Sequence, residues 1–131
     1  MHQYKIRIFD LIFNNRLLMT FSTHKLEELE KKKINDLEKK RKELLHLTID
    51  VLNKYFSPLN VNSLYITGSV IMPFKFKSRS DIDIAVEGLS SEKYFQAIYE
   101  LSELLSRQVE IIELENCRFS DKIIKTGLKI I

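Results

Sequence analysis

Cysteine, glycine and proline are scarce in this 131-residue sequence, which has one cysteine, three glycines and two prolines. Cys117 has no partner for an internal disulfide, and with three scattered histidines it cannot supply a convincing zinc shell, so a reducing cytoplasm is expected. So little glycine and proline argues against a disordered chain and against an all-β chain that needs many tight turns. We therefore expect one globular domain of the α/β or α class.

Long hydrophobic runs and an excess of one charge are missing as well. Arg7, Asp10 and Arg16 interrupt the apolar stretches of residues 1–18 before any reaches the length of a signal peptide or a membrane span. Lysine and arginine number 21 against 18 acidic residues, which leaves a formal net charge of +3. This balance does not give the electrostatic footprint of a nucleic-acid-binding protein, so neither a membrane nor nucleic acid is an expected partner.

A long helix is predicted from Lys25 to about Tyr55, because this segment has no glycine or proline and is rich in leucine, glutamate, lysine and arginine. Its apolar residues are sparse at first, so we expect the helix to join the core near Leu44. From there on a broad buried face is expected, made of Leu44, Leu45, Leu47, Ile49, Val51, Leu52, Tyr55 and Phe56. The lysine and arginine runs at 31–33 and 39–42 alternate with acidic residues at i,i+4 spacing, which is typical of a solvated helix face.

The predicted organisation has three parts: an N-terminal extension over residues 1–24, the long helix over 25–56 with its second half in the core, and a domain over 57–131. The sequence leaves open whether translation starts at Met1 or at Met19. It also leaves the oligomeric state open.

Strands and helices alternate after Pro58. Short apolar, β-rich segments predict strands at 64–67, 82–86 and 109–114. A helix capped by Ser90 or Ser91 is expected between the last two, with these residues on one side: Phe95, Ile98, Leu101, Leu104 and Leu105. A short helix capped by Ser120 and ended by Gly127 is expected before an edge strand at 128–131. The alternation predicts a layered α/β domain.

Candidate functional residues begin at Gly68 and Ser69, directly after a predicted strand. Glycine there lets the backbone approach a ligand closely, and Ser69 offers a hydroxyl and an amide to phosphate oxygens. Asp81 and Asp83 follow, and if both lie on a strand their side chains project from one face about 7 Å apart along the backbone. Two carboxylates on one face repel each other unless a cation lies between them, and hard oxygen ligands suit Mg²⁺.

Glu110 is the candidate third acid, with Glu113 as a rival for the metal. It lies within the otherwise apolar run of the third predicted strand, where a charge is costly unless it has a function. Three acids beside a phosphate-binding turn are typical of a phosphoryl or nucleotidyl transfer site.

At these residues the sequence resembles a known family. The segments YITGSVIMPFKFKSRSDIDIAVEGL (65–89) and RQVEIIELE (107–115) are similar to the minimal nucleotidyltransferases of the DNA polymerase β-like superfamily. The resemblance extends over about residues 44–131. It implies the nucleotidyltransferase fold, a small mixed β-sheet with helices packed on it, here with a long N-terminal helix. It also implies that Gly68 and Ser69 hold the triphosphate of ATP, that Asp81 and Asp83 bind two magnesium ions, and that Glu110 is the third acid.

The resemblance also implies a partner. Members of this minimal group are similar to antitoxins that act on a toxin of the all-helical HEPN ribonuclease fold, some by transferring AMP from ATP to a tyrosine of that toxin. Only 21 residues follow Glu110, so we expect the acceptor hydroxyl to be presented by another protein. The alternatives are a stand-alone nucleotidyltransferase acting on a small molecule or an RNA end, and a catalytically weak module that neutralises a ribonuclease by contact.

Two features differ from the family pattern. The segment after Ser69 is apolar from Val70 to Phe74, where many relatives are small and basic, and Glu110 replaces a more common aspartate. Fewer phosphate contacts and altered metal geometry are expected from these differences, and they are the reason for keeping the binding-module alternative.

Overall fold

The structure is a computed structural model that describes the backbone of residues 2–131 and the side chains of residues 23–131. The chain forms two compact units, residues 1–36 and residues 37–131. Most of the predicted extension over residues 1–24 lies outside the residues whose side chains are described. The same holds for Met1 and Met19, the two possible starts of translation. The predicted boundaries after residues 24 and 56 stay predictions.

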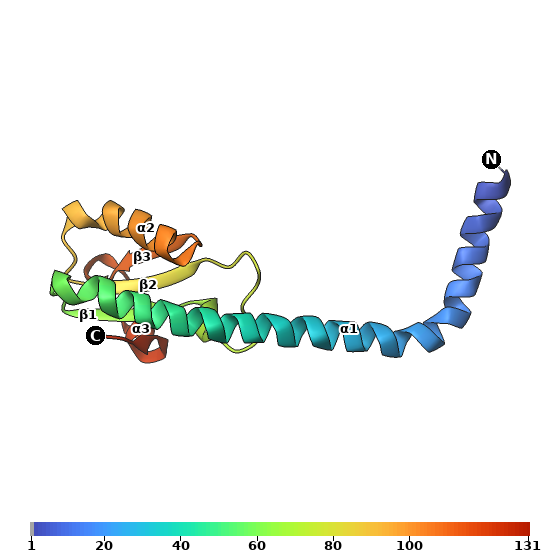
Figure 1. Ribbon diagram of the computed structural model, residues 1–131, viewed down its shortest axis with the longest axis horizontal. Helices are drawn as coiled ribbons and strands as arrows, with labels where there is room; N and C mark the ends of the chain where they lie inside the picture. Colours follow the sequence, from blue (N-terminus) through green and yellow to red (C-terminus); the bar gives the residue numbers. More distant parts are fainter. Residues whose placement is uncertain (1) are drawn as a thin grey trace. The chain divides into compact units, whose positions relative to one another are not determined.

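The second unit is built on a four-stranded mixed sheet (Figure 1). The strands are β1 (Ser63–Thr67), β2 (Ile82–Glu87), β3 (Val109–Glu113) and β4 (Leu128–Lys129), in the order β3-β2-β1-β4. Strand β2 pairs antiparallel with β1 and parallel with β3, and β4 pairs antiparallel with β1. The three predicted strands, the edge strand and the mixed α/β fold are therefore confirmed.

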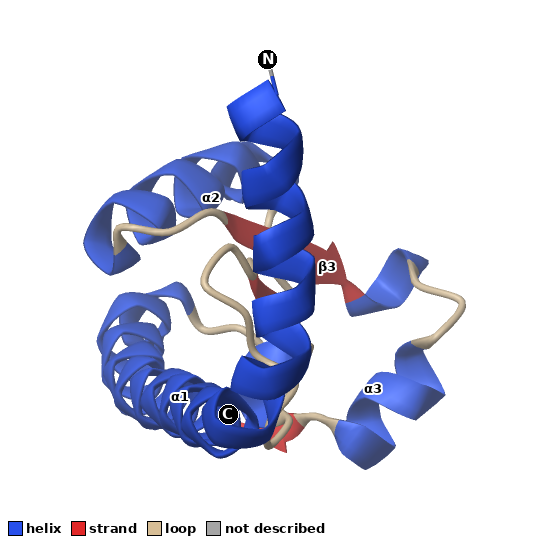
Figure 2. Cartoon of the chain, turned by 90° about the vertical axis from the view of Figure 1, so that its right-hand side faces the viewer, coloured by secondary structure: helices blue, strands red, loops and turns tan. Residues whose placement is uncertain are grey.

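Helices cover both faces of the sheet. The C-terminal part of α1 (His2–Phe56) and α2 (Ser91–Leu105) pack on one face, where they bury side chains such as Leu52, Phe56 and Leu101 against Ile66 and Ile84. The short α3 (Ser120–Thr126) lies on the other face, where Ile123 joins a second cluster with Tyr65, Ala85 and Leu114. Figure 2 shows α2 and α3 as separate helices connected through β3. Alternation along the strands thus gives the sheet one large and one small apolar face.

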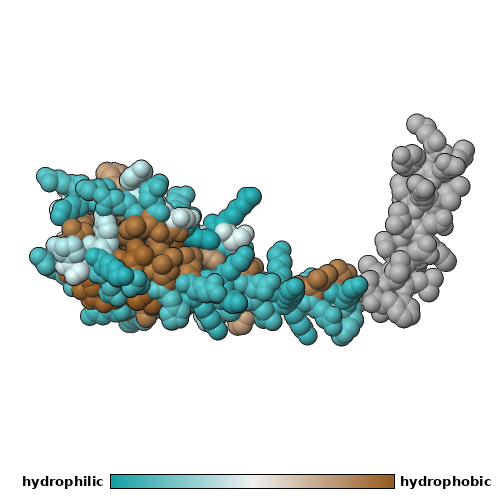
Figure 3. Space-filling view, viewed as in Figure 1, coloured by the Kyte–Doolittle hydropathy of each residue, from teal (hydrophilic) through white to brown (hydrophobic). Residues whose placement is uncertain are grey.

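Helix α1 enters the core earlier than expected. Arg41 is only 5% exposed, so packing begins about one turn before Leu44. Leu47, expected on the buried face, is 47% exposed, which corrects that assignment. In residues 23–36 the described surface is mostly hydrophilic apart from a small hydrophobic area (Figure 3), in agreement with the exposure of Leu26, Leu29 and Ile34.

The other helices differ from expectation in detail. The buried positions of α2 are Ala97, Leu101 and Leu105, which follow i,i+4 spacing, whereas Phe95 and Leu104 are exposed and were wrongly placed on the buried side. Ser90 occupies the N-cap position of α2. In α3 the N-cap is Phe119 and Ser120 is the first helical residue, so the predicted serine cap is wrong.

The chain ends as an edge of the sheet. Gly127 is the C-cap of α3, as expected, and its amide donates a hydrogen bond to the Ile123 carbonyl at 2.7 Å. After β4, the Ile130 amide donates to the Leu64 carbonyl at 2.8 Å. Within the described part of the chain, no helix is both long and apolar enough to cross a membrane.

Candidate active site

The candidate acids lie on the face of the sheet that carries α3. In the strand register Asp83 is opposite Thr67 on β1 and opposite Glu110 on β3. Because β2 and β3 are parallel and in this register, the side chains of Asp83 and Glu110 project side by side from one face. Their neighbours in sequence, Ile82 and Val109, point into the large core on the opposite face.

The charge on Asp83 is unfavourable in this setting. Burial raises the pKa of Asp83 to about 6, with further contributions from the charge of Glu110, a hydrogen bond with the Glu110 carboxyl, and the charge of Asp81. The negative charges of Asp81 and Glu110 therefore both act on the Asp83 carboxyl. Such a concentration of negative charge is the electrostatic environment that a bound cation relieves.

Asp81 lies one residue before β2 rather than on it. This corrects the assumption that both aspartates belong to one strand. Asp81 directly follows the loop of residues 72–80, and Arg107 holds the last residues of this loop. The Arg107 guanidinium donates to the carbonyls of Ser78 at 3.1 Å and Ser80 at 2.6 Å, and its central carbon lies 4.9 Å from the centre of the Phe76 ring.

Gly68 lies directly against Asp83. Its backbone has φ 80° and ψ −161°, a conformation that is essentially restricted to glycine. A Cβ atom built at this position would overlap with the Asp83 Oδ2 atom and would lie 3.2 Å from its Cγ. Ser69 then starts a 3-10 turn, Ser69–Ile71, that the Met72 amide closes by donating to the Ser69 carbonyl at 3.1 Å. The structure therefore places Gly68 against Asp83, with Ser69 as the next residue of the turn, and their role in binding a triphosphate stays a prediction.

A buried ion pair that sequence reasoning missed supports this turn. Arg41 donates from Nη1 to the Val70 carbonyl at 3.0 Å and makes two hydrogen bonds with the Glu38 carboxylate. Glu38 in turn accepts a hydrogen bond from the Phe74 amide at 3.0 Å. The hydrogen bonds from Arg41 and Phe74 lower the pKa of Glu38 to about 2, and the Glu38 carboxylate raises the pKa of Arg41 above its usual value. Helix α1 thereby anchors both ends of segment 70–74.

The three acids fit a divalent metal by donor type. They offer carboxylate oxygens, which Mg²⁺ prefers, at a point where their charges repel one another. Across residues 23–131, however, no group of three or more histidine, cysteine, aspartate or glutamate side chains is already close enough to share a metal ion. Glu110 is exposed and Asp81 is partly exposed, so both side chains have room to turn toward Asp83. The metal-binding role of Asp81, Asp83 and Glu110 stays a prediction.

A cavity of about 360 Å³ opens beside Asp83. Gly68 and Asp83 belong to its lining, and the remaining lining comes from Thr67, Ile112, Phe119, Lys122 and Ile123. Lys122 is the one cation of this lining and was not identified from the sequence, because it lies on α3, far along the chain from the motif. A second cavity, of about 620 Å³, shares Ile112 and Phe119 with the first.

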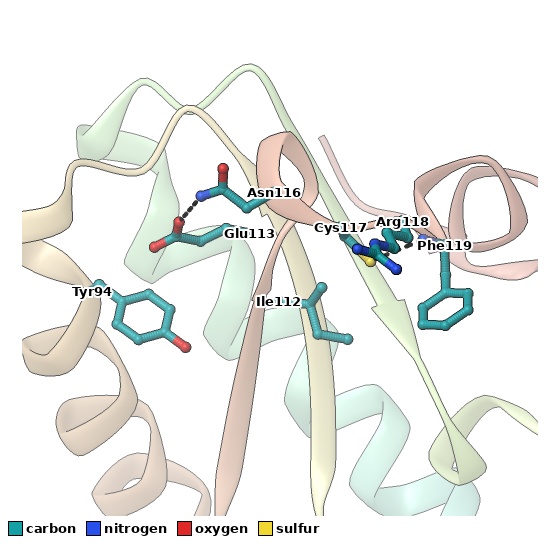
Figure 4. Close-up of a pocket in the computed structure, with 7 residues that line it drawn as sticks. All are labelled: Tyr94, Ile112, Glu113, Asn116, Cys117, Arg118 and Phe119. Carbon is teal, nitrogen blue, oxygen red and sulfur yellow. Dashed lines mark hydrogen bonds between the residues drawn. The ribbon is translucent and has the colours of Figure 1, made fainter.

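The second cavity extends the first toward α2. Figure 4 shows its lining residues, with Tyr94 coming from α2 and Glu113 and Asn116 joined by a hydrogen bond of 2.8 Å. The Tyr94 hydroxyl donates to the Ile111 carbonyl at 2.9 Å, which holds its ring against β3. The two cavities combine apolar walls with one end at Asp83, an arrangement suited to a ligand that carries both an apolar and a charged part.

Comparison with known proteins gives a consistent result. The family model for polymerase beta, nucleotidyltransferase, matches residues 47–131. No curated protein matches the sequence. Among solved structures, a mutant MntA-HpeT toxin-antitoxin is similar with a TM-score of 0.54 and 17% identity, covering 63% of this chain and 71% of the other.

Two further structures show the same likeness. The MntA-HepT toxin-antitoxin has a TM-score of 0.51 and 18% identity, covering 66% of this chain and 71% of the other. A toxin-antitoxin with AMP-PNP has a TM-score of 0.52 and 21% identity, covering 64% and 70%. At these identities the likeness establishes a shared fold.

Proposed function

Because the chain belongs to the polymerase beta nucleotidyltransferase family, we propose that it transfers AMP from ATP to a hydroxyl of a partner protein. The observation that carries this proposal is the meeting of Gly68, Asp83 and Glu110 on one face of the sheet. A glycine turn beside converging carboxylates combines a place for phosphate groups with a place for the cations that neutralise them.

The residues of the site take separate roles in this proposal. Gly68 and Ser69 bind the triphosphate through backbone amides and the Ser69 hydroxyl. Asp81, Asp83 and Glu110 would hold two magnesium ions, which when bound lower the pKa of an attacking hydroxyl and neutralise the phosphate charges. In the reaction, the hydroxyl oxygen bonds to the α-phosphorus, the bond to pyrophosphate breaks, and exposed Glu110 accepts the hydroxyl proton.

The acceptor is proposed to be a tyrosine of a HEPN-domain toxin, with this chain acting as the antitoxin. The similarity in fold to structures described as MntA-HepT toxin-antitoxins supports this partner. The structure with AMP-PNP supports an adenosine triphosphate as donor. A cytoplasmic location follows from the proposed substrates.

A second candidate function is neutralisation of the toxin by contact, with weak or no catalysis. It is favoured by the absence, among residues 23–131, of three acidic side chains already placed to share a metal ion. The apolar segment from Val70 to Phe74 also leaves fewer cations for phosphate next to Ser69.

Intact mass spectrometry distinguishes the two functions. The chain is incubated with ATP, Mg²⁺ and the purified HEPN-domain partner, and both proteins are weighed before and after. The proposal predicts one or more added AMP groups on the partner, and none when Asp81 and Asp83 are both replaced by asparagine. A partner that is bound and inhibited without any change in mass would support the contact mechanism instead.

A further inference from the structure

The loop of residues 72–80 carries an exposed apolar tip. Phe74 is 67% exposed and Met72 is 45% exposed, on either side of Pro73. None of these three side chains has a hydrogen-bond donor with which to recognise a phosphate or a base edge. Since the proposed transfer reaction does not use them, their exposure is without a role in the site described above.

The tip is held in place at some energetic cost. Phe74 has φ 63°, a left-handed conformation that is unfavourable for a bulky residue. Its amide donates to Glu38, which is paired with the buried Arg41, and Arg41 also binds the Val70 carbonyl. Arg107 fixes the far end of the loop through the carbonyls of Ser78 and Ser80. The two arginines thus hold the backbone of the loop that carries this exposed ring.

Three positive side chains, the rim of the tip, follow it along the loop. Lys75, Lys77 and Arg79 are exposed, and no acidic residue occurs between Ser69 and Ser80. The ion pairs of residues 23–131 are His24–Glu28, Glu38–Arg41 and Asp50–Lys54, so none of the loop cations is paired within the described part of the chain. An apolar centre with a charged rim is the composition of a protein-protein contact, in which Phe, Met and Arg are enriched.

The loop also leads directly into the candidate site. It follows the turn at Gly68 and Ser69 and ends at Asp81. We propose that the 72–80 loop is a docking surface for the acceptor protein, which would receive Phe74 and Met72 in an apolar pocket bordered by acidic side chains. The proposal deepens the proposed function, and rests on it for the statement that the docked protein is the acceptor.

Docking at this loop would bring the acceptor close to Asp81, because the loop ends directly before this residue. It also gives a physical reason for the exposed apolar residues Met72 to Phe74, whereas Val70 is apolar because it is fully buried in the core. The buried Arg41–Glu38 pair then acts on docking by fixing the backbone that carries Phe74, and the ordering of the loop before binding reduces the entropy lost on association.

The test measures affinity of the full-length chain for the purified HEPN-domain partner by isothermal titration. Phe74→Gly and Phe74→Asn both suit a left-handed backbone, so they remove the ring and keep the fold. We expect each to weaken binding at least tenfold without lowering the thermal unfolding midpoint. Phe95→Ala is the matched control, because Phe95 is 76% exposed on α2, and its affinity should change less than twofold.

A charge variant tests the rim. Replacing Lys75 and Lys77 with glutamate should weaken binding at low salt and reduce its salt dependence. Unchanged affinity of both Phe74 variants would overturn the docking proposal. Loss of single-stranded RNA binding by these variants, with partner affinity intact, would overturn it in favour of an RNA contact.

Transfer of AMP is measured separately, so that the two proposals can fail independently. If the parent chain transfers no nucleotide but the Phe74 variants bind the partner more weakly, the docking proposal holds and the proposed reaction is wrong. If the parent chain transfers AMP and the Phe74 variants bind and react like the parent, the proposed reaction holds and the docking proposal is wrong.

Discussion

Replacing Gly68 with alanine perturbs the contact on which the candidate site is built. The backbone at Gly68, with φ 80°, is in a region that costs about 1–3 kcal/mol for a residue with a side chain. The added Cβ would also overlap with the Asp83 carboxylate and push that side chain off its rotamer, at about 0.5–1.5 kcal/mol. We therefore expect Gly68→Ala to lower the free energy of unfolding by about 2–4 kcal/mol.

A double-mutant cycle separates the two contributions. In an Asp83→Ala background the carboxylate is gone, so Gly68→Ala should cost only the backbone part, and the coupling energy between the two sites should be about 1 kcal/mol. Gly88 is the matched control, because it also has positive φ, at 92°, but its Cβ would meet Asn62 and not an acid. Gly88→Ala and Asp83→Ala should therefore be additive.

Urea denaturation followed by circular dichroism measures all these variants. A cost for Gly68→Ala that is the same with and without the Asp83 carboxylate would refute the contact. A cost below about 0.5 kcal/mol would refute the strained backbone as well.

Three further results are expected. Without metal, Asp83→Asn should stabilise the fold by about 1 kcal/mol at pH 8 and not at pH 4, and urea denaturation at both pH values checks this. The reason is that the folded-state pKa of Asp83 is raised from 3.8 to about 6, so the stability of the parent falls as pH rises from 4 to 6. Solvent screening reduces the full effect at this half-buried group. Arg41→Met should lower the free energy of unfolding by about 2–4 kcal/mol, because it leaves the Val70 carbonyl and the Glu38 carboxylate without their partner. A decrease below about 1 kcal/mol would contradict the anchoring role. Ser69→Ala should raise the ATP concentration needed for half-maximal transfer, because it removes one hydrogen bond to a charged group, about 1.5–3 kcal/mol, while the maximal rate changes less. If Ser69 acted in the chemical step, steady-state kinetics would show mainly a lower maximal rate.

The row of site residues was predictable from the sequence because strand side chains alternate. Once Asp83 and Glu110 are assigned to strands whose neighbours Ile82 and Val109 are apolar, both must face away from the core. Their pairing in a parallel register was not predictable, since strand order and direction depend on contacts distant in the chain. The predicted strand 82–86 already left Asp81 just before β2, so alternation along the strand could not fix the direction of the Asp81 side chain.

The anchoring of the loop left no signal in the sequence. Arg41 stands in the run Lys39-Lys40-Arg41-Lys42, and composition cannot identify the one buried cation among four. Phe95 and Leu104 were misplaced for a related reason: α2 has large apolar residues on more than one side, and burial is decided by which side meets the sheet. Such choices are made by tertiary packing, which local patterns do not contain.

Transfer of radioactive label from ATP to the partner protein tests the central claim most directly. The chain, Mg²⁺ and the purified HEPN-domain partner are incubated with ATP labelled at either the α- or the γ-phosphate. Nucleotidyl transfer predicts that the α label, and not the γ label, becomes attached to the partner, and that Asp83→Asn abolishes the attachment. Attachment of the γ label, or attachment of the α label at the parent rate in a chain lacking the Asp81 and Asp83 carboxylates, would contradict the account.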